Sequence, residues 1–274
     1  MPISPNCWQR STKARGAAFR DTGGPVPGLT AGASACGRVL AVDIARGVAL
    51  AGMILFHTVT DLELFGHLPP GTSTSGGWAV FARVVAGSFL FLVGVSLVLA
   101  HRDGIRWPAV TGRIARIAAA AALITAVTWA AMPERFVFFG ILHSIAVASL
   151  LGLAFLRLPW IIALAAALAV AVLPQVLRSP LFDPPALVWT GLAVRVPVSM
   201  DFVPVFPWFG ATLAGIAAAG LAGRAGLWDR LRHGAANRSA TARLLSWPGR
   251  HSLAIYLLHQ PVLIAAIWGV GRLV

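Results

Sequence analysis

The chain has 274 residues, of which 58% are hydrophobic and only 11% are Asp, Glu, Lys or Arg. Soluble domains carry about 25% charged residues, so this composition excludes an ordinary soluble domain. The net charge of +13 would suit nucleic-acid binding in another protein. Here no polar domain exists to carry such a surface, and we expect no nucleic-acid partner.

Apolar residues come in runs of about twenty, the length of helix that crosses about 30 Å of hydrocarbon. Inside lipid, a chain satisfies its backbone hydrogen bonds only as a helix or a closed barrel. Runs such as 161–172 do not alternate between apolar and polar residues, which excludes a barrel. The sequence therefore predicts an all-α fold, a polytopic integral membrane helix bundle of about seven transmembrane helices.

In chain order, residues 1–37 are rich in Gly, Pro, Ser and Arg and contain no apolar run, a composition typical of disorder. We expect a disordered basic tail there and one transmembrane domain over 38–274. The predicted spans lie near 39–60, 79–100, 110–132, 136–156, 159–177, 203–223 and 252–273.

Basic residues indicate the orientation of these spans. Most of them lie in the tail and in the loops 101–116 and 224–250, which the predicted spans place on one side of the bilayer. Cytoplasmic loops carry an excess of Lys and Arg. We therefore expect a multi-pass protein of the inner (cytoplasmic) membrane, with a cytoplasmic N-terminus and an external C-terminus.

The first span contains charged residues at both ends. Asp43 and Arg46 are three residues apart and can form an ion pair on one helix face. Alternatively, Arg46 belongs to an anion site for a cofactor phosphate, with Gly47 allowing close approach. At the other end, Asp61 lies four residues after His57 and can hold its imidazole in one tautomer, which would leave the second nitrogen free to act as a base. Simple exposure of both side chains to water is the alternative.

Two later histidines also lie in apolar stretches. His143, next to Ser144, is either a catalytic group or a buried residue satisfied by a neighbouring helix. His259 precedes Pro261, which frees carbonyl groups in the helix, so contact with a cofactor and packing around a kink are both open.

Asp201, His67 and Arg83 are expected near the external face as substrate-binding residues. Asp201 is either a substrate-binding carboxylate or an exposed loop residue. Arg83, near the start of the second span, either reaches the interface or pairs with an external acid such as Asp61. Metal-binding and soluble-enzyme motifs are absent from the sequence, so we expect no metal.

Four blocks of the chain carry a resemblance, in series over residues 38 to about 265: GRVLAVDIARGVALAGMILFHTVTDLELFG, FLFLVGVSL, VFFGILHSIAVASLL with VPVFPWFGATLAG, and GRHSLAIYLLHQPVL. Together they resemble the bacterial relatives of heparan-alpha-glucosaminide N-acetyltransferase, within the transmembrane acyltransferases. The resemblance implies acetyl-CoA as the acyl donor, taken from the cytoplasm, and a glycan or glycolipid acceptor on the external face. It also implies a histidine near the first external loop, for which both His57 and His67 are candidates.

Acetyl transfer assigns roles to these residues. His57, oriented by Asp61, would be the base, and the His143 region would supply donors for the oxyanion. Arg46 and the basic loop 102–116 would bind phosphate. Direct transfer and an acetyl-histidine intermediate are both open. The rival classes are a small-molecule or proton-coupled transporter and a non-catalytic assembly subunit, and a homo-oligomer is compatible with each.

Overall fold

The computed structural model describes residues 39–102, 104–233 and 239–270, so the predicted tail 1–37 lies outside the described residues. The described chain is helical. Its α-helices are α2 (Leu40–Leu64), α3 (Gly76–Ala100), α4 (Trp107–Ala131), α5 (Ile141–Gly152), α6 (Trp160–Leu177), α7 (Pro185–Val188), α8 (Val205–Arg224), α9 (Leu227–His233), α10 (Ala240–Leu245), α11 (Trp247–Arg250) and α12 (Ser252–Val270). Two 3-10 turns, Leu153–Phe155 and Pro180–Phe182, complete the described elements.

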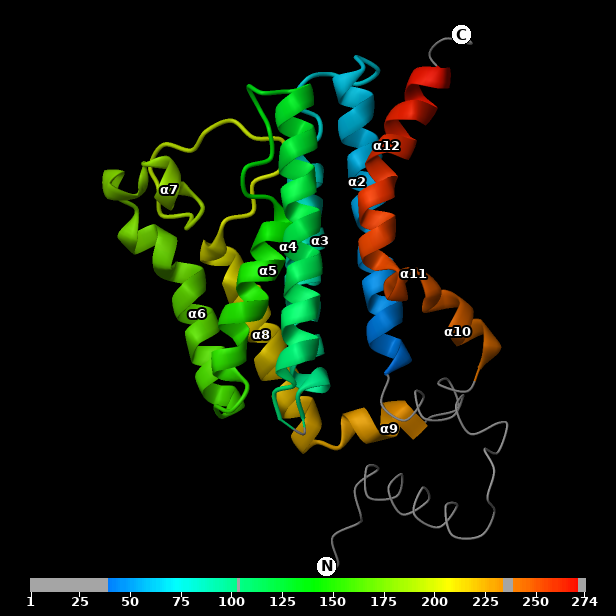
Figure 1. Cartoon of the computed structure of the whole chain (residues 1–274), viewed down its shortest axis with the longest axis vertical. Helices are drawn as coiled ribbons and strands as arrows, with labels where there is room; N and C mark the ends of the chain where they lie inside the picture. The colour runs from blue at the N-terminus through cyan, green and yellow to red at the C-terminus, as the bar shows by residue number, and fades with distance from the viewer. Residues whose placement is uncertain (1–38, 103, 234–238, 271–274) are drawn as a thin grey trace, which may run out of the picture.

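Among the described residues, six helices are long and apolar enough to cross a membrane: α2, α3, α4, α6, α8 and α12. With the shorter α5, they run alternately up and down in Figure 1, from the start of α2 at the bottom to the end of α12 at the top. The bottom of the bundle in Figure 1, where α9 lies, is called the α9 end, and the top, where α12 ends, is called the outer end. The predicted polytopic all-α bundle is confirmed.

The fourth predicted span, 136–156, is too long, because the helix begins only at Ile141. The preceding residues form a turn, bends and irregular chain, and Phe139 pairs with Phe202 in a parallel β-bridge. The backbone N–H of Val203 donates to the carbonyl of Phe139, and that of Met200 donates to the carbonyl of Arg135. Non-helical backbone is tolerated at membrane depth when protein groups satisfy it in this way.

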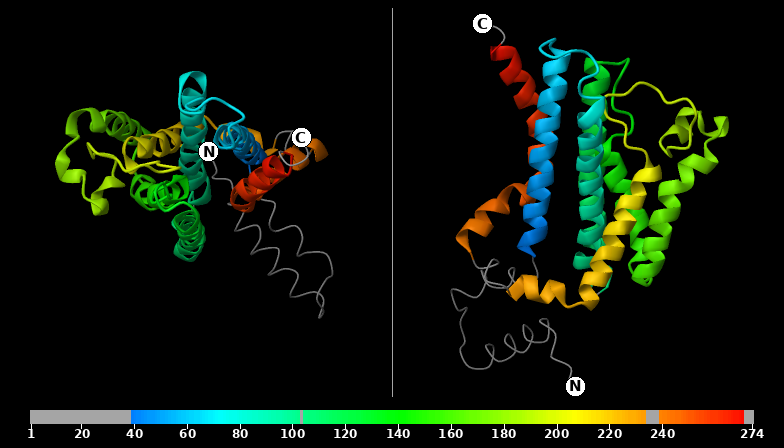
Figure 2. Two further views of the ribbon diagram at one scale, coloured as in Figure 1. Left: turned by 90° about the horizontal axis from the view of Figure 1, so that it is seen from above. Right: turned by 180° about the vertical axis from the view of Figure 1, so that it is seen from behind.

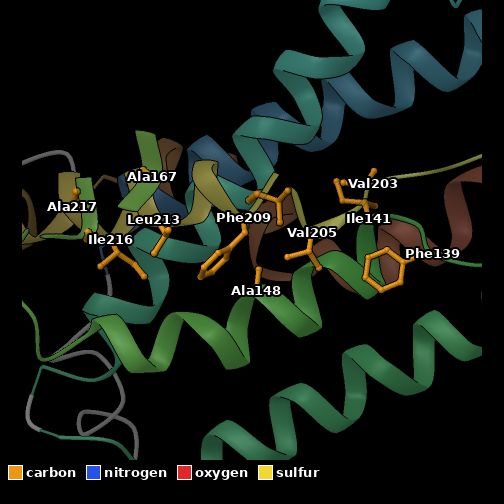
Figure 3. Close-up of a cluster of buried hydrophobic side chains, with 12 residues drawn as sticks. Phe139, Ile141, Ala148, Ala167, Val203, Val205, Phe209, Leu213, Ile216 and Ala217 are labelled. Atoms are coloured by element: carbon orange, nitrogen blue, oxygen red, sulfur yellow. The ribbon is translucent and has the colours of Figure 1, made fainter. Parts of the chain in front are cut away.

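The main core lies where α8 packs against α3, α5 and α6 (Figure 3). Figure 2 shows α3 between this group and a second group formed by α2 and α12. Half of the most apolar window of α8 is buried, compared with 6% in α12. The chain is therefore built around α8, and α12 lies at the periphery.

Small residues allow α3 and α8 to approach closely. A Cβ atom on Gly94 would overlap the carbonyl oxygen of Thr212, and one on Gly215 would overlap the carbonyl oxygen of Phe91. Because the backbones lie this close, the hydroxyl of Thr212 reaches the carbonyl of Leu90 at 3.1 Å. Close contact between small residues is a common way for membrane helices to associate.

This contact predicts that Gly94→Ala destabilises the bundle. The added methyl group meets backbone atoms that cannot move aside, and such overpacking costs about 1–3 kcal/mol. The matched control is Gly112→Ala on α4, where a Cβ would have nothing within 4 Å. Thermal unfolding in detergent should show a lower midpoint for Gly94→Ala and an unchanged or higher midpoint for Gly112→Ala. Equal midpoints would contradict the assigned contact.

A second close approach joins α2 to α11. A Cβ on Gly249 would overlap the carbonyl oxygen of Asp43, so only glycine fits at this point. Gly47, which the sequence analysis related to a phosphate, instead lies near the backbone of Gly249 and Leu245. The contact fixes where α12 begins along α2.

Candidate active site

The contact between α2 and α12 brings together histidines from the first and last spans. The ring centroids of His57 and His259 lie 4.9 Å apart, with the ring planes tilted by 58°. His57 is half-buried and His259 is only 9% exposed. His57 lies roughly 26 Å along α2 from Leu40, at about 1.5 Å per residue, which places the pair in the outer half of α2.

Asp61 belongs to the same contact, but with a different partner from the one expected. Its Oδ1 accepts a hydrogen bond of 2.6 Å from Nε2 of Gln260, and its side chain is almost fully buried. Among the described residues, no hydrogen bond joins Asp61 to His57. The expectation that Asp61 orients the ring of His57 is therefore replaced by a link between Asp61 and α12.

The hydrogen bond of His259 fixes its tautomer. Its Nδ1 lies within hydrogen-bonding distance of the backbone carbonyl of Tyr256. A carbonyl oxygen can only accept, so Nδ1 carries the proton and Nε2 carries a lone pair. That Nε2 is buried and makes no hydrogen bond among the described residues. His259 was expected, like Arg46, to contact the cofactor, but the fold places it against His57, about three turns along α2 from Arg46.

His143 has the opposite arrangement. The backbone N–H of Gly140 donates to its Nδ1 at 3.2 Å. Its Nε2 must then carry the proton, and it lies 3.3 Å from the hydroxyl oxygen of Thr125. That hydroxyl in turn donates to the carbonyl of Val137. Both ring nitrogens are occupied, so the contacts favour the structural alternative for His143 over the supply of an oxyanion donor.

Asp201 caps the start of α5. Its Oδ2 accepts a 2.8 Å hydrogen bond from the backbone N–H of Ile141, at the positive end of the helix dipole. A narrow pocket beside it is lined partly by His143 and Tyr256. Burial raises the pKa of Asp201 to about 6, and the hydrogen bond from Ile141 acts in the opposite direction. Asp201 is thus a structural carboxylate rather than an exposed loop residue.

Substitutions of Asp201 should separate the contribution of the helix cap to stability from that of the carboxylate charge. Asp201→Asn keeps an acceptor oxygen for Ile141, whereas Asp201→Ala removes it and should cost about 0.5–2 kcal/mol of stability. An acid whose pKa is raised by folding binds its proton more tightly in the folded state. The free energy of unfolding therefore increases as the pH falls through the folded-state pKa of Asp201, about 6.

We therefore expect the unfolding midpoint of the wild type, measured relative to that of Asp201→Asn, to rise as the pH falls from about 7 to about 5. Thermal unfolding of the three proteins in one detergent at several pH values measures both effects. A difference between wild type and Asp201→Asn that stays constant over this range would count against the raised pKa.

Arg46 connects three segments near the α9 end. Its guanidinium forms the predicted ion pair with Asp43 at 2.9 Å, which confirms that local pairing. It also donates to the hydroxyl of Ser96 on α3 at 2.8 Å and to the carbonyl of Gly249 at 3.3 Å. Arg46 therefore holds α2, α3 and α11 together, and a role in binding phosphate stays a prediction.

The other two predicted substrate-binding residues lie outside the α2–α12 contact. His67 is exposed in the turn after α2, which Glu63 stabilises by accepting hydrogen bonds from the backbone of Gly71 and Ser73. Arg83 is exposed on α3, and no ion pair with Asp61 occurs among the described residues. The described residues contain no group of three or more His, Cys, Asp or Glu placed to bind a metal.

Two further residues belong to this contact and were not predicted from the sequence, Tyr256 and Gln260. Tyr256 is the only tyrosine in the chain, and its ring lies 5.5 Å from that of His259. Gln260 is the partner of Asp61. A unique tyrosine and a glutamine beside a histidine in an apolar span are signals that could have identified both.

A helix bundle with paired histidines and a buried carboxylate between membrane spans defines a polytopic membrane protein with an internal polar site. Residues 38–261 match the family described as heparan-alpha-glucosaminide N-acetyltransferase, catalytic. The chain belongs to this family, and it is a transmembrane acetyltransferase. Comparison with curated proteins found no match, and comparison with solved structures found none either.

Proposed function

We propose that this protein moves an acetyl group from acetyl-CoA in the cytoplasm to a sugar or glycan acceptor on the external face of the inner membrane. The observation that carries the proposal is the pair formed by His57 and His259 in the outer half of the bundle. An acceptor arriving from outside meets this half first. Acetyl transfer from a thioester needs a group that takes the acceptor's proton, and imidazole is the side chain best suited to it at neutral pH.

Buried polar groups around the pair support the assignment. A carboxylate inside a membrane span is costly unless it is partnered, and it commonly marks a functional site. Asp61 is such a group, held by Gln260 from the other helix. Within this site, His57 acts either as the base or as the nucleophile that carries the acetyl group.

The α9 end of the bundle suits the donor. Arg46 lies near the start of α2, and Arg113 and Arg116 lie near the start of α4, so three guanidinium groups belong to the α9 end of the bundle (Figure 1). Arg113 is half-buried and Arg116 is exposed. Guanidinium groups bind phosphate well, so this cluster fits the phosphates of acetyl-CoA.

The first test of the proposal is His57→Ala. Loss of the reacting imidazole should lower acetyl transfer roughly a hundredfold or more, while CoA binding persists because the basic cluster lies at the other end. The envelope fraction is prepared from cells that lack the protein, and wild type or variant is added to it together with labelled acetyl-CoA. The assay measures the labelled acetyl transferred into this fraction. The control is His101→Ala, at the end of α3, whose ring contacts its own helix at the carbonyl of Leu97.

Wild-type protein that labels no envelope material beyond the level of His57→Ala would overturn the proposed function. That result would favour the transporter alternative, in which the same intramembrane groups move a proton or a solute.

The orientation gives a second test. If the N-terminus is cytoplasmic, the turn between α2 and α3 is external and α9 is cytoplasmic. In a background with both natural cysteines, Cys7 and Cys36, replaced by Ser, Thr74→Cys and Arg230→Cys place single thiols at exposed positions on these two segments. A membrane-impermeant thiol reagent should label Thr74→Cys in intact cells and should label Arg230→Cys only after lysis. The reverse pattern would invert the orientation and remove the cytoplasmic site for the donor.

A further inference from the structure

Three polar atoms at the α2–α12 contact are buried and make no hydrogen bond among the described residues. They are Oδ2 of Asp61, Nε2 of His259 and Oε1 of Gln260. All three are acceptors, because the carbonyl of Tyr256 fixes the proton of His259 on Nδ1. Buried polar groups are normally hydrogen-bonded. Unsatisfied acceptors gathered on two adjacent helices therefore indicate a hydrogen-bond donor that does not belong to the described residues.

The chemistry of the cluster limits what this donor can be. A metal ion is a poor fit, because no described group of three or more His, Cys, Asp or Glu is placed to hold one. An N–H or O–H group is the partner that each of these acceptors lacks among the described residues. In an acetyl transfer, the group that gains the acetyl carries such a hydrogen and must lose it.

We infer that Nε2 of His259 is the atom that accepts this proton. The inference rests on the proposed acetyl transfer and assigns the base to the histidine of the last span. The geometry separates the two rings of the pair: His259 has a fixed tautomer with its lone pair directed away from its own helix backbone. The ring of His57 packs against it and is left to contact the acetyl group.

The proposed steps conserve protons and electrons, and they need no further reactant. The acceptor N–H or O–H gives its proton to Nε2 as its nitrogen or oxygen bonds to the thioester carbonyl carbon. The carbon–sulfur bond then breaks, and sulfur leaves with the electron pair. The imidazolium formed on His259 returns the proton to that sulfur, which yields the free thiol. Asp61, which accepts a hydrogen bond from the adjacent residue Gln260, provides a carboxylate at the same α2–α12 contact.

A purely structural role for His259 is the competing explanation. Its Nδ1–H binds the carbonyl of Tyr256 in a helix that contains Pro261, and this contact alone would justify a histidine here. The two roles use different nitrogens. The structural role needs only Nδ1, and the catalytic role needs Nε2 as well.

Asparagine separates the two roles, because its amide N–H can replace Nδ1–H while nothing replaces Nε2. We therefore expect His259→Asn to fold, to bind CoA and to transfer acetyl into the envelope fraction at least a hundredfold more slowly. The matched control is His251→Asn. His251 is exposed, and its Nδ1 likewise binds a carbonyl of its own helical segment, that of Trp247.

A second variant tests the role of Nε2 of His259 directly, and its result does not depend on that of His259→Asn. His259→Ala should also be inactive, and added imidazole should restore transfer in proportion to its concentration, because a free imidazole can supply the missing lone pair. Imidazole should have no effect on His259→Asn, where the amide fills the space. A structural role predicts no rescue, since the lost contact is then to the helix backbone.

The outcomes distinguish this inference from the proposed function. A folded His259→Asn protein with wild-type transfer, together with an inactive His57→Ala protein, overturns the inference and leaves the proposed function standing. Absence of imidazole rescue in a folded His259→Ala protein likewise overturns it. If wild type and His57→Ala do not differ, the proposed function itself has failed.

Discussion

The contact between Gly249 and the backbone of α2 is the constraint on which the site depends. It fixes the start of α12 along α2, and Arg46 strengthens it by donating to the carbonyl of Gly249. From that start α12 runs alongside α2 in the same direction (Figure 1). In the outer half His57 then meets His259, and Asp61 meets Gln260. The contact at the α9 end thus helps to place α12 where these residues meet.

Within this frame, the surroundings of each histidine decide its chemistry. His143 accepts from Gly140 and donates to Thr125, so both nitrogens are used in holding the start of α5. His259 uses one nitrogen for its own helix and keeps the other unsatisfied and buried. The same residue type, in apolar helices of the same bundle, is thus saturated in one place and available in the other.

The sequence predicted what depends on local spacing and composition. The apolar runs placed the long helices, and the three-residue spacing of Asp43 and Arg46 predicted their ion pair. Contacts that depend on the rotation of one helix against another were beyond reach, and Asp61 received the wrong partner for this reason. The fourth span was overestimated because hydropathy cannot distinguish a partly buried non-helical segment from a helix, and the segment before Ile141 is such a case.

The peripheral position of α12 has a consequence for any measurement of this protein. Only 6% of its most apolar window is buried, whereas α8 forms the centre of the core. Heat or detergent that loosens α12 would part His259 from His57 and leave α3, α6 and α8 packed. Inactivation and unfolding are then two separate events, and a preparation with its full helical signal in circular dichroism can already have lost its site.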